Sequence, residues 1–415
     1  MPHVIRPLPT PSRGFLLGMA APGLALSLAI TMVSAYAPPL IAELSSAGVA
    51  GAIIGAEGVF ALLVPVAVGA RSDRTRSRFG SRMPFLAAGT LLMVVALLVL
   101  PATRSLLVVA LALCVFYIGY FTSYAPYRAL YPDCIGSAHQ GRALGFQSTL
   151  REIGLGVALV GGGLLFATGR ALPFVVAAVV VALIMVVFVV RVRDPALGPA
   201  PELGPVERKA LRRNAWRASL EVLRRREDVR RLLAANALWE LGQAALKSFA
   251  VLFVIEGLGR SASFASLVFA VVAATAIGAA LVGGNLADRR GYRVLVLPSV
   301  VLYGLGAIAV GLTQSVVVLA AVPVLAFAAA MTTTLSFAWL SRLTADEEHG
   351  LTAGLFGLSQ GAGIVAGPVL AGLAVELGRP ALPGTDGYAA IFFVVGAAVL
   401  ASFAFVVRVP DAPAG

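Results

Sequence analysis

The chain has 415 residues, of which 59% are hydrophobic and only 13% are charged. Soluble domains carry about 25% charged residues, so the bulk of this chain is expected in a lipid bilayer. The net charge of +12 would suit a nucleic-acid partner, but the basic residues gather in alternate loops between apolar segments. That pattern is typical of a membrane protein and argues against nucleic-acid binding.

Twelve apolar segments are each long enough to cross a hydrocarbon core, which takes roughly 20 helical residues. They predict an all-α membrane protein with twelve transmembrane helices in two pseudo-symmetric six-helix bundles. The expected spans are 14–38, 48–70, 83–101, 105–131, 142–167, 171–191, 229–256, 262–284, 292–313, 316–341, 350–376 and 386–408.

A long polar stretch separates the first six spans from the last six. It contains four prolines and a basic run that includes Arg212 and Arg213, which favours a flexible linker followed by a surface helix. We therefore expect an N-terminal bundle over 1–191, a cytoplasmic linker over 192–228 and a C-terminal bundle over 229–415.

Loop charge predicts the orientation in the membrane. The loops after the second, sixth and eighth spans are rich in arginine, whereas most of the alternate loops hold at most one. Because basic loops stay on the cytoplasmic side, both termini are expected in the cytoplasm and the protein in the cell membrane.

The loop after the second span is the most distinctive polar segment. It places five arginines and one aspartate within residues 69–84, and a shorter version recurs after the eighth span, within residues 284–293. We interpret the charged pairs as gating hinges that pair across the ends of neighbouring helices and act in switching. The hinge residues are Asp73, Arg74, Arg78, Asp288 and Arg289.

The same pattern, Gly-x-x-x-Asp-Arg, opens this loop in each half, from Gly69 and from Gly284. The fifth and eleventh spans also resemble each other and are rich in glycine. In these features the chain resembles the major facilitator superfamily. That resemblance implies two six-helix halves and secondary transport by alternating access, with the first, fourth, seventh and tenth helices lining a central cavity.

Two stretches resemble a narrower group. Residues 72–85, and the run from Pro126 to Asp133 with the pattern Pro-x-Arg-Ala-Leu-x-x-Asp, resemble the plant sucrose transporters within the glycoside–pentoside–hexuronide cation symporters. This resemblance implies proton-coupled symport of a sugar or glycoside-like solute and makes Arg128 a substrate-site residue. Tyr117 stands where that group has its proton-carrying aspartate, so another acid carries the proton here, or the coupling differs.

The seventh span carries a polar stripe. Asn236, Glu240, Gln243 and Lys247 follow the i, i+4, i+7, i+11 spacing of one helix face, with Trp239 beside it. Such a face cannot point into lipid, so these residues are predicted to line a cavity and contact substrate. The alternative is a buried polar network that holds helices together.

The fourth span carries an aromatic stripe with a cation. Tyrosine rings stack on sugar rings or flat organic ligands, and an arginine supplies a fork of donors. Packing is the alternative for each tyrosine. The predicted contacts here are Tyr120, Tyr124, Tyr127 and Arg128.

Three acids within the spans are candidates for proton coupling: Glu240 first, then Glu57, with Glu152 third. Arg151 is the expected partner of one of them. A direct pair between Arg151 and Glu152 is not expected, because neighbouring residues diverge by about 100° around a helix.

The tenth span has a hydroxyl-rich patch with one indole. Ser336 belongs to this patch. Packing through backbone bonds is favoured for Thr332, Thr333 and Thr334, and a ligand contact for Trp339. The sequence offers no nucleophile or metal constellation and no Walker loop. We therefore expect neither an enzyme nor an ATP-driven pump, and no cofactor or metal.

Three functions remain open. The first is proton-coupled symport of a small polar solute, and the second is proton-coupled efflux of an amphipathic metabolite or drug. The third is a membrane assembly factor that transports nothing, which the buried charges in both halves argue against. The expected partners are a small-molecule substrate, a proton or another monovalent cation, and the bilayer. We expect a monomer.

Overall fold

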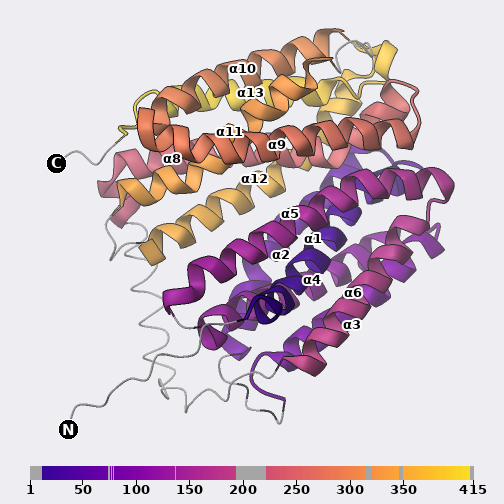
Figure 1. Ribbon diagram of the computed structural model, residues 1–415. Coiled ribbons are helices and arrows are strands. Elements are labelled where there is room, and N and C mark those ends of the chain that lie inside the picture. Colours follow the sequence, from indigo (N-terminus) through magenta and orange to yellow (C-terminus); the bar gives the residue numbers. More distant parts are fainter. Residues whose placement is uncertain are drawn as a thin grey trace. The chain divides into compact units, whose positions relative to one another are not determined.

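The computed structural model describes residues 12–72, 75, 77, 79–135, 137–192, 221–313, 320–344 and 349–411. The regular elements of these residues are helices (Figure 1). The long helices are α1 (Arg13–Ala42), α2 (Ala47–Ser72), α3 (Met83–Val99), α4 (Leu106–Cys134), α5 (Ser137–Thr168), α6 (Leu172–Arg191), α8 (Glu227–Leu252), α9 (Ala262–Arg290), α10 (Tyr292–Thr313), α11 (Val322–Leu343), α12 (His349–Gly378) and α13 (Ala390–Val406).

Hydropathy and length confirm the predicted class. Over the described residues, 11 helices are long and apolar enough to cross a membrane, and Ala390–Val406 is a shorter apolar helix that completes the set of twelve. The boundaries differ from the prediction by a few residues. Most of the expected linker and its surface helix, including Arg212 and Arg213, lie outside the described residues.

Contacts divide the chain into two compact units. The first unit comprises Met1–Val33 and Leu63–Ala200, and the second comprises Ser34–Leu62 and Pro201–Gly415. The end of α1 and the first half of α2 therefore group with the later helices, although they precede them in sequence by a long way.

Small residues bring the helices of the first unit together. In this unit α3 packs against α4 and α6, and α5 against α4 and α6. A Cβ atom at Gly89 of α3 would lie 2.5 Å from the carbonyl oxygen of Gly119 on α4. Without a hydrophobic drive between helices in lipid, such close backbone approach is a main source of helix association.

The helices of the second unit form a continuous chain of neighbours. α12 lies along α8, α8 along α13, α13 along α10, and α11 beside α10 and α9 (Figure 1). Trp239, Phe249, Tyr303 and Val395 are fully or almost fully buried where these helices meet.

A glycine seam joins α2 to α12 within the second unit. A Cβ atom at Gly55 would lie 2.9 Å from the carbonyl oxygen of Val365, and Gly51 meets Pro368 more closely still. At one end of the seam, Glu376 Oε1 accepts a 2.9 Å hydrogen bond from the Gly48 N–H. A carboxylate beside the first turn of α2 is favourable, because the N–H groups there have no partner within the helix.

A strap of residues 407–411 closes one end of the second unit. Its Pro410 carbonyl oxygen accepts a 2.9 Å hydrogen bond from Trp339 Nε1 of α11. Asp411 Oδ1 accepts a 2.7 Å bond from the Arg293 N–H in the first turn of α10. Val409, which precedes these two residues, is fully buried, so the strap is part of the packed structure.

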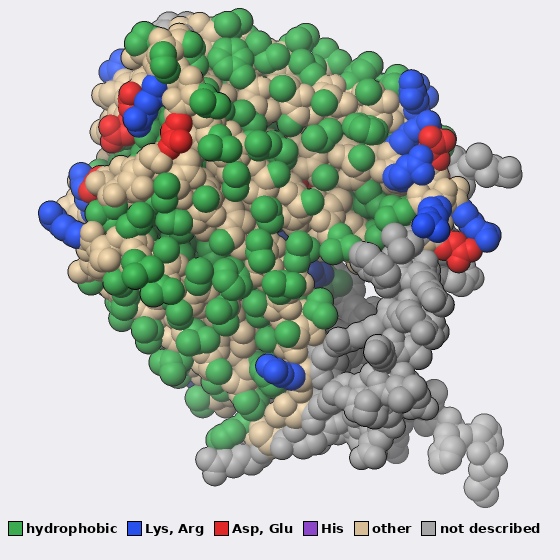
Figure 2. Space-filling model, turned by 180° about the vertical axis from the view of Figure 1, so that it is seen from behind, with side chains coloured by type: hydrophobic (Ala, Val, Ile, Leu, Met, Phe, Trp, Pro, Cys, Tyr) green, Lys and Arg blue, Asp and Glu red, His purple; other side chains and the backbone are tan. Residues whose placement is uncertain are grey.

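The surface between the helix ends is apolar. In the second unit, Leu302, Leu305 and Leu312 are among the exposed apolar side chains, while charged side chains gather near the ends of the helices (Figure 2). A surface of this kind is stable against lipid and would be unstable in water.

Candidate functional site

The polar stripe of α8 is confirmed as a single helical segment, because Asn236, Glu240, Gln243 and Lys247 all fall within Glu227–Leu252. Asn236 is fully buried, and the other three are half-buried. The stripe lies in a span whose other residues are mostly alanine, leucine and aromatic residues. Its polar groups therefore depend on partners from other helices.

α12 supplies those partners. Asn236 Nδ2 donates to Ser359 Oγ at 2.8 Å, and Gln360 Nε2 donates to Glu240 Oε1 at 2.9 Å. These two rungs, each joining α8 to α12, form what we call the polar ladder. It places an acidic side chain within a membrane span with an amide directed at its carboxylate.

Two glycines of α12 make the ladder possible. A Cβ atom at Gly363 would lie 2.5 Å from the Ala237 carbonyl oxygen and 2.6 Å from Glu240 Cβ. One turn further on, Gly367 contacts the Leu241 backbone in the same way. The helices therefore approach closely enough for the short side chains of the ladder to bond.

Lys247 lies two turns beyond Glu240 on the same face. No ion pair joins the two in the described part of the chain, as expected from their separation on one helix, but they are close enough to interact electrostatically. Gln243 lies between them. The stripe thus carries one potential negative and one potential positive charge within a membrane span.

Glu57 of α2 has a partner of its own. Its Oε2 accepts a 3.2 Å hydrogen bond from Ser34 Oγ of α1, and both residues belong to the second unit. Gly58, the next residue, packs against Gly361 of α12. α12 is therefore flanked by two acid-bearing helices, with Glu240 on α8 and Glu57 on α2.

The first unit carries a cation beside stacked rings. The Arg128 guanidinium lies 5.7 Å from the centre of the Tyr124 ring, and the Tyr124 and Tyr120 rings stack with centres 5.6 Å apart. Arg128 is exposed, and both tyrosines are partly exposed. This arrangement presents a flat aromatic surface with a five-donor cation at one end.

Arg151 and Glu152 of α5 do form an ion pair, at 2.7 Å, so the prediction that they would not pair was wrong. Their Cβ atoms diverge around the helix, but both side chains are exposed and long enough to bend toward each other. The pair lies within the apolar span Ala143–Thr168. An exposed ion pair at that position is costly against lipid, so this face of α5 is expected to border water.

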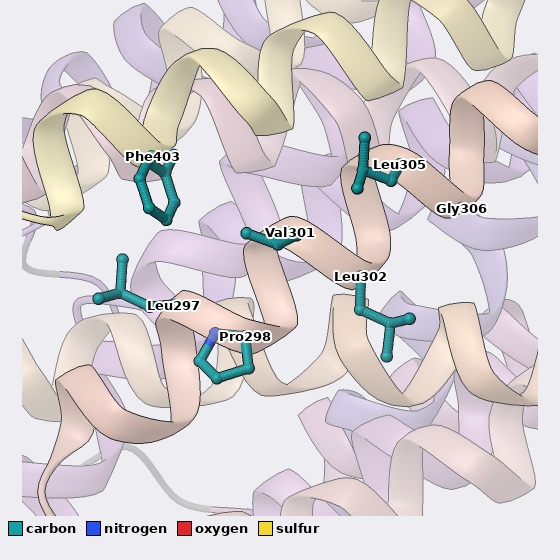
Figure 3. Close-up of a pocket in the computed structure, with 7 residues that line it drawn as sticks. All are labelled: Leu297, Pro298, Val301, Leu302, Leu305, Gly306 and Phe403. Carbon is teal, nitrogen blue, oxygen red and sulfur yellow. The ribbon is translucent and has the colours of Figure 1, made fainter.

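An apolar groove between α10 and α13 has a different character (Figure 3). Its lining contains no charged or hydrogen-bonding side chain, so it offers nothing to orient a polar solute. The lining residues are Leu297, Pro298, Val301, Leu302, Leu305, Gly306 and Phe403.

Comparison with known families decides the class of this protein. The profile described as Major Facilitator Superfamily matches residues 19–259 and 232–415, which together span nearly the whole chain. The chain belongs to the major facilitator superfamily. It is therefore a multi-pass membrane transporter of small molecules rather than an enzyme.

Solved structures agree on the fold of this transporter. A bacterial homolog of the human lysosomal transporter Spinster, in an inward-facing and unoccupied conformation, matches with TM-score 0.73 and 16% identity over 96% of both chains. The nucleoside transporter NupG matches with TM-score 0.73 and 14% identity, over 94% of this chain and 98% of that one. The POT family transporter PepTSo matches with TM-score 0.73 and 12% identity, over 96% and 98%.

These identities establish the fold alone. NupG is named as a nucleoside transporter, and the other two names state no substrate. A search of curated proteins found no match.

Three aromatic residues predicted to contact substrate lie instead in packing contacts of the transporter. Tyr127 is fully buried, and its hydroxyl group donates to the Met19 carbonyl oxygen at 3.0 Å. Trp239 Nε1 donates to Ser402 Oγ at 2.8 Å, and Trp339 is held by the strap. With no exposed surface and their polar atoms bonded, these side chains join helices in this conformation.

The hydroxyl residues of α11 mostly bond to their own helix, as favoured from the sequence. Thr332 Oγ1 donates to the Ala329 carbonyl oxygen at 2.7 Å, and Ser336 Oγ donates to that of Thr333 at 2.9 Å. Thr334 alone of the group is exposed. The patch is therefore mainly part of helix packing.

The gating residues are only partly visible. Asp73, Arg74 and Arg78 lie outside the described residues, as does the side chain of Asp288. Arg289 is exposed in the last turn of α9, where a cation is favourable beside the carbonyl end of a helix. The proposed hinge pairs stay predictions.

Sequence reasoning missed Ser359 and the bond from Gln360 to Glu240. The signal was the spacing of Gly363 and Gly367, four residues apart on the same helix, which is typical of close helix contact. No group of three or more metal-ligating side chains occurs among the described residues.

Proposed function

We propose that this transporter carries a small polar organic solute, of the sugar or glycoside class, by proton-coupled symport across the cell membrane. The observation that carries the proposal is the polar ladder, which holds Glu240 within a membrane span with a hydrogen-bond partner. An acid at that depth is retained at a cost in free energy, and a role in proton movement accounts for it.

The first unit supports a polar, ring-shaped substrate. Tyr120 and Tyr124 present stacked faces that suit the apolar side of a sugar ring, while Arg128 supplies donors for a pair of hydroxyl oxygens. The resemblance of residues 126–133 to the sugar symporter group points to the same arginine. We assign substrate contact to these three residues and, on α8, to Gln243 and Lys247.

Arginine-rich loops support a cytoplasmic location for both termini, and we propose a monomer as the working unit. Glu240 is the first candidate for the proton carrier and Glu57 the second. Glu152 comes third, because it is exposed and forms an ion pair with Arg151, whereas Glu240 has an amide of another helix as its partner.

Uptake of radiolabelled disaccharides and glycosides into proteoliposomes, driven by an imposed pH gradient, tests the proposal. We expect accumulation that collapses with the gradient and is abolished in Glu240→Gln. The matched control is Glu256→Gln, which alters an exposed acid outside the ladder and should transport normally. Absence of gradient-driven uptake of any glycoside, from protein that is correctly folded, would contradict symport of this class.

Efflux of an amphipathic compound is the second candidate, favoured by the stacked tyrosines and by the absence of an acid at Tyr117, which is fully buried. A strain lacking the gene, grown on a panel of toxic compounds, separates the two. Increased sensitivity that wild type restores and Glu240→Gln does not would support efflux. If Glu240→Gln changes neither gradient-driven uptake nor growth on the toxic compounds, an assembly role explains the protein better than transport.

A further inference from the structure

One oxygen of the polar ladder has no hydrogen-bond partner among the described residues, namely Asn236 Oδ1. The side chain is fully buried, so bulk water does not reach this oxygen. A buried acceptor without a donor lowers stability, because it has lost its hydrogen bonds to water and gained none in return. The site therefore lacks one hydrogen-bond donor for this oxygen.

The orientation of the amide follows from its neighbours. Ser359 Oγ donates its own hydrogen to the Phe356 carbonyl oxygen at 2.7 Å, and so has only lone pairs left for Asn236. The NH₂ group of Asn236 must face Ser359, and it does so at 2.8 Å. Rotation of the amide would set two oxygens against each other, so Oδ1 points away from Ser359.

Glu240 lies one turn further along the same face of α8. Side chains four residues apart on a helix are neighbours, and pairs of carboxyl and amide groups at this spacing form hydrogen bonds. An ionised carboxylate can only accept, as Glu240 does from Gln360. Once protonated, it gains an O–H donor, which is the hydrogen that Asn236 Oδ1 lacks.

We propose that Asn236 is a positioning residue for the coupling proton: protonated Glu240 donates its O–H to Asn236 Oδ1, whereas Gln360 holds the ionised form. The inference rests on the proposed function, in which Glu240 carries the proton. It moves Asn236 from substrate contact to proton binding. The two amides stabilise opposite protonation states of one acid.

The charged groups around Glu240 are few. On α8 itself, Lys247 is the nearest charge along the helix, two turns beyond Glu240. α13 has no ionisable side chain, α11 has only Arg342 in its last turn, and the π-helical turn Phe253–Gly257 after α8 has only Glu256, which is exposed. α12 has only His349 and Glu376, near its two ends. Among these groups the two amides are the nearest to the carboxyl group, so the balance between its protonated and ionised forms depends mainly on them.

Infrared titration of the purified full-length transporter in lipid vesicles tests this without a substrate. The carboxyl band of Glu240 is identified by its loss in Glu240→Gln. Asn236→Leu removes the acceptor at similar volume and should lower the pH midpoint of this band by about one unit. Gln360→Met removes the donor to the carboxylate and should raise the midpoint by a similar amount.

Opposite shifts from two neighbouring residues are the decisive result, since general loosening of the site would move both midpoints the same way. Leu246→Met is the control, on the same helix but outside the polar stripe, and should leave the midpoint in place. Asn236→Ala repeats the loss of the acceptor if the leucine variant does not fold.

Three results would overturn the proposal. They are an unmoved midpoint in the Asn236 variants, shifts of the same sign for both amides, and a wild-type midpoint displaced when sodium replaces choline in the buffer. The last would mean that a metal ion competes for these oxygens. Opposite shifts in a protein that shows no gradient-driven uptake would instead support the roles of the two amides at Glu240 and contradict the proposed function.

Discussion

At the scale of single residues, Tyr303 of α10 is a buried polar group that no ligand role explains. Its hydroxyl oxygen has no hydrogen-bond partner among the described residues. It lies 3.7 Å from the position that a Cβ atom of Gly242 on α8 would occupy, beside Val395 and Val399 of α13. The hydroxyl group thus sits among apolar groups where three helices meet.

Replacing Tyr303 with phenylalanine should stabilise the protein. The ring keeps its packing, and the loss of an unsatisfied hydroxyl group removes a penalty of about 1 kcal/mol. Thermal unfolding of the detergent-solubilised protein measures the change. Trp239→Phe serves as the opposite case, because it removes a satisfied bond to Ser402 and should lower the unfolding temperature. A drop in both variants would show that the Tyr303 hydroxyl group has a partner.

The residues that sequence predicted well are those whose role depends on their own helix. The face shared by Asn236 and Glu240 follows from periodicity alone. Trp239 and Trp339 are predicted substrate contacts, because one lies beside the polar stripe and the other is the indole of a hydroxyl-rich patch. Their partners, Ser402 and the Pro410 carbonyl oxygen, are distant in sequence, and periodicity does not reveal them.

At the scale of helices, α12 is the element on which most of the candidate site depends. One side meets α8 through Gly363 and Gly367, and the other meets α2 through Gly361. Helix–helix contacts in lipid are limited by backbone approach, so a single methyl group at these positions separates the helices.

Gly363→Ala should therefore destabilise the protein by about 1–3 kcal/mol, since its Cβ atom has no space beside the Ala237 carbonyl oxygen. It should also weaken coupling, because the bond between Gln360 and Glu240 depends on the same approach. The matched control is Gly357→Ala on the same helix, where a Cβ atom meets nothing within 4 Å. There alanine should be neutral or slightly stabilising. Thermal unfolding and uptake of both variants are the measurements, and equal behaviour would contradict the packing argument.

Hydropathy predicted the helices to within a few residues, because length and apolar composition are properties of each segment alone. Hydropathy does not predict that α8 pairs with α12, because contacts between segments far apart in sequence depend on the shapes of their surfaces. The same limit explains Arg151 and Glu152. Helical geometry describes where their Cβ atoms point, but not where two long exposed side chains bend.

At the scale of the whole molecule, α2 crosses from one unit to the other. Its first half, to Leu62, belongs to the second unit, and the first unit resumes at Leu63. The seam between α2 and α12 is thus a place where a covalent link would join the second unit to a helix that continues into the first. Transport by alternating access requires such contacts to change.

The pair Leu62→Cys and Gly361→Cys tests this requirement. A Cβ atom at Gly361 would lie 2.9 Å from Leu62 Cγ, so two cysteines there are close enough for a disulfide once the leucine is removed. The natural Cys114 and Cys134, both free, are first replaced by serine. Oxidation should stop uptake and reduction should restore it, whereas either single cysteine should transport normally. Full uptake by the oxidised pair would show that this seam stays closed throughout the cycle.

The strap of residues 407–411 affects the order in which this protein folds during its synthesis. The Arg293 N–H and the Asp411 carboxylate that accepts from it are 118 residues apart in the chain. Until the ribosome has delivered Asp411, the first turn of α10 is exposed without its partner, although α10 has long since entered the bilayer. This end of the protein therefore reaches its final fold only after the helices have inserted. A chain truncated before residue 407 should keep all of its long helices and still be bound by chaperones and degraded by proteases, because this end remains incompletely folded.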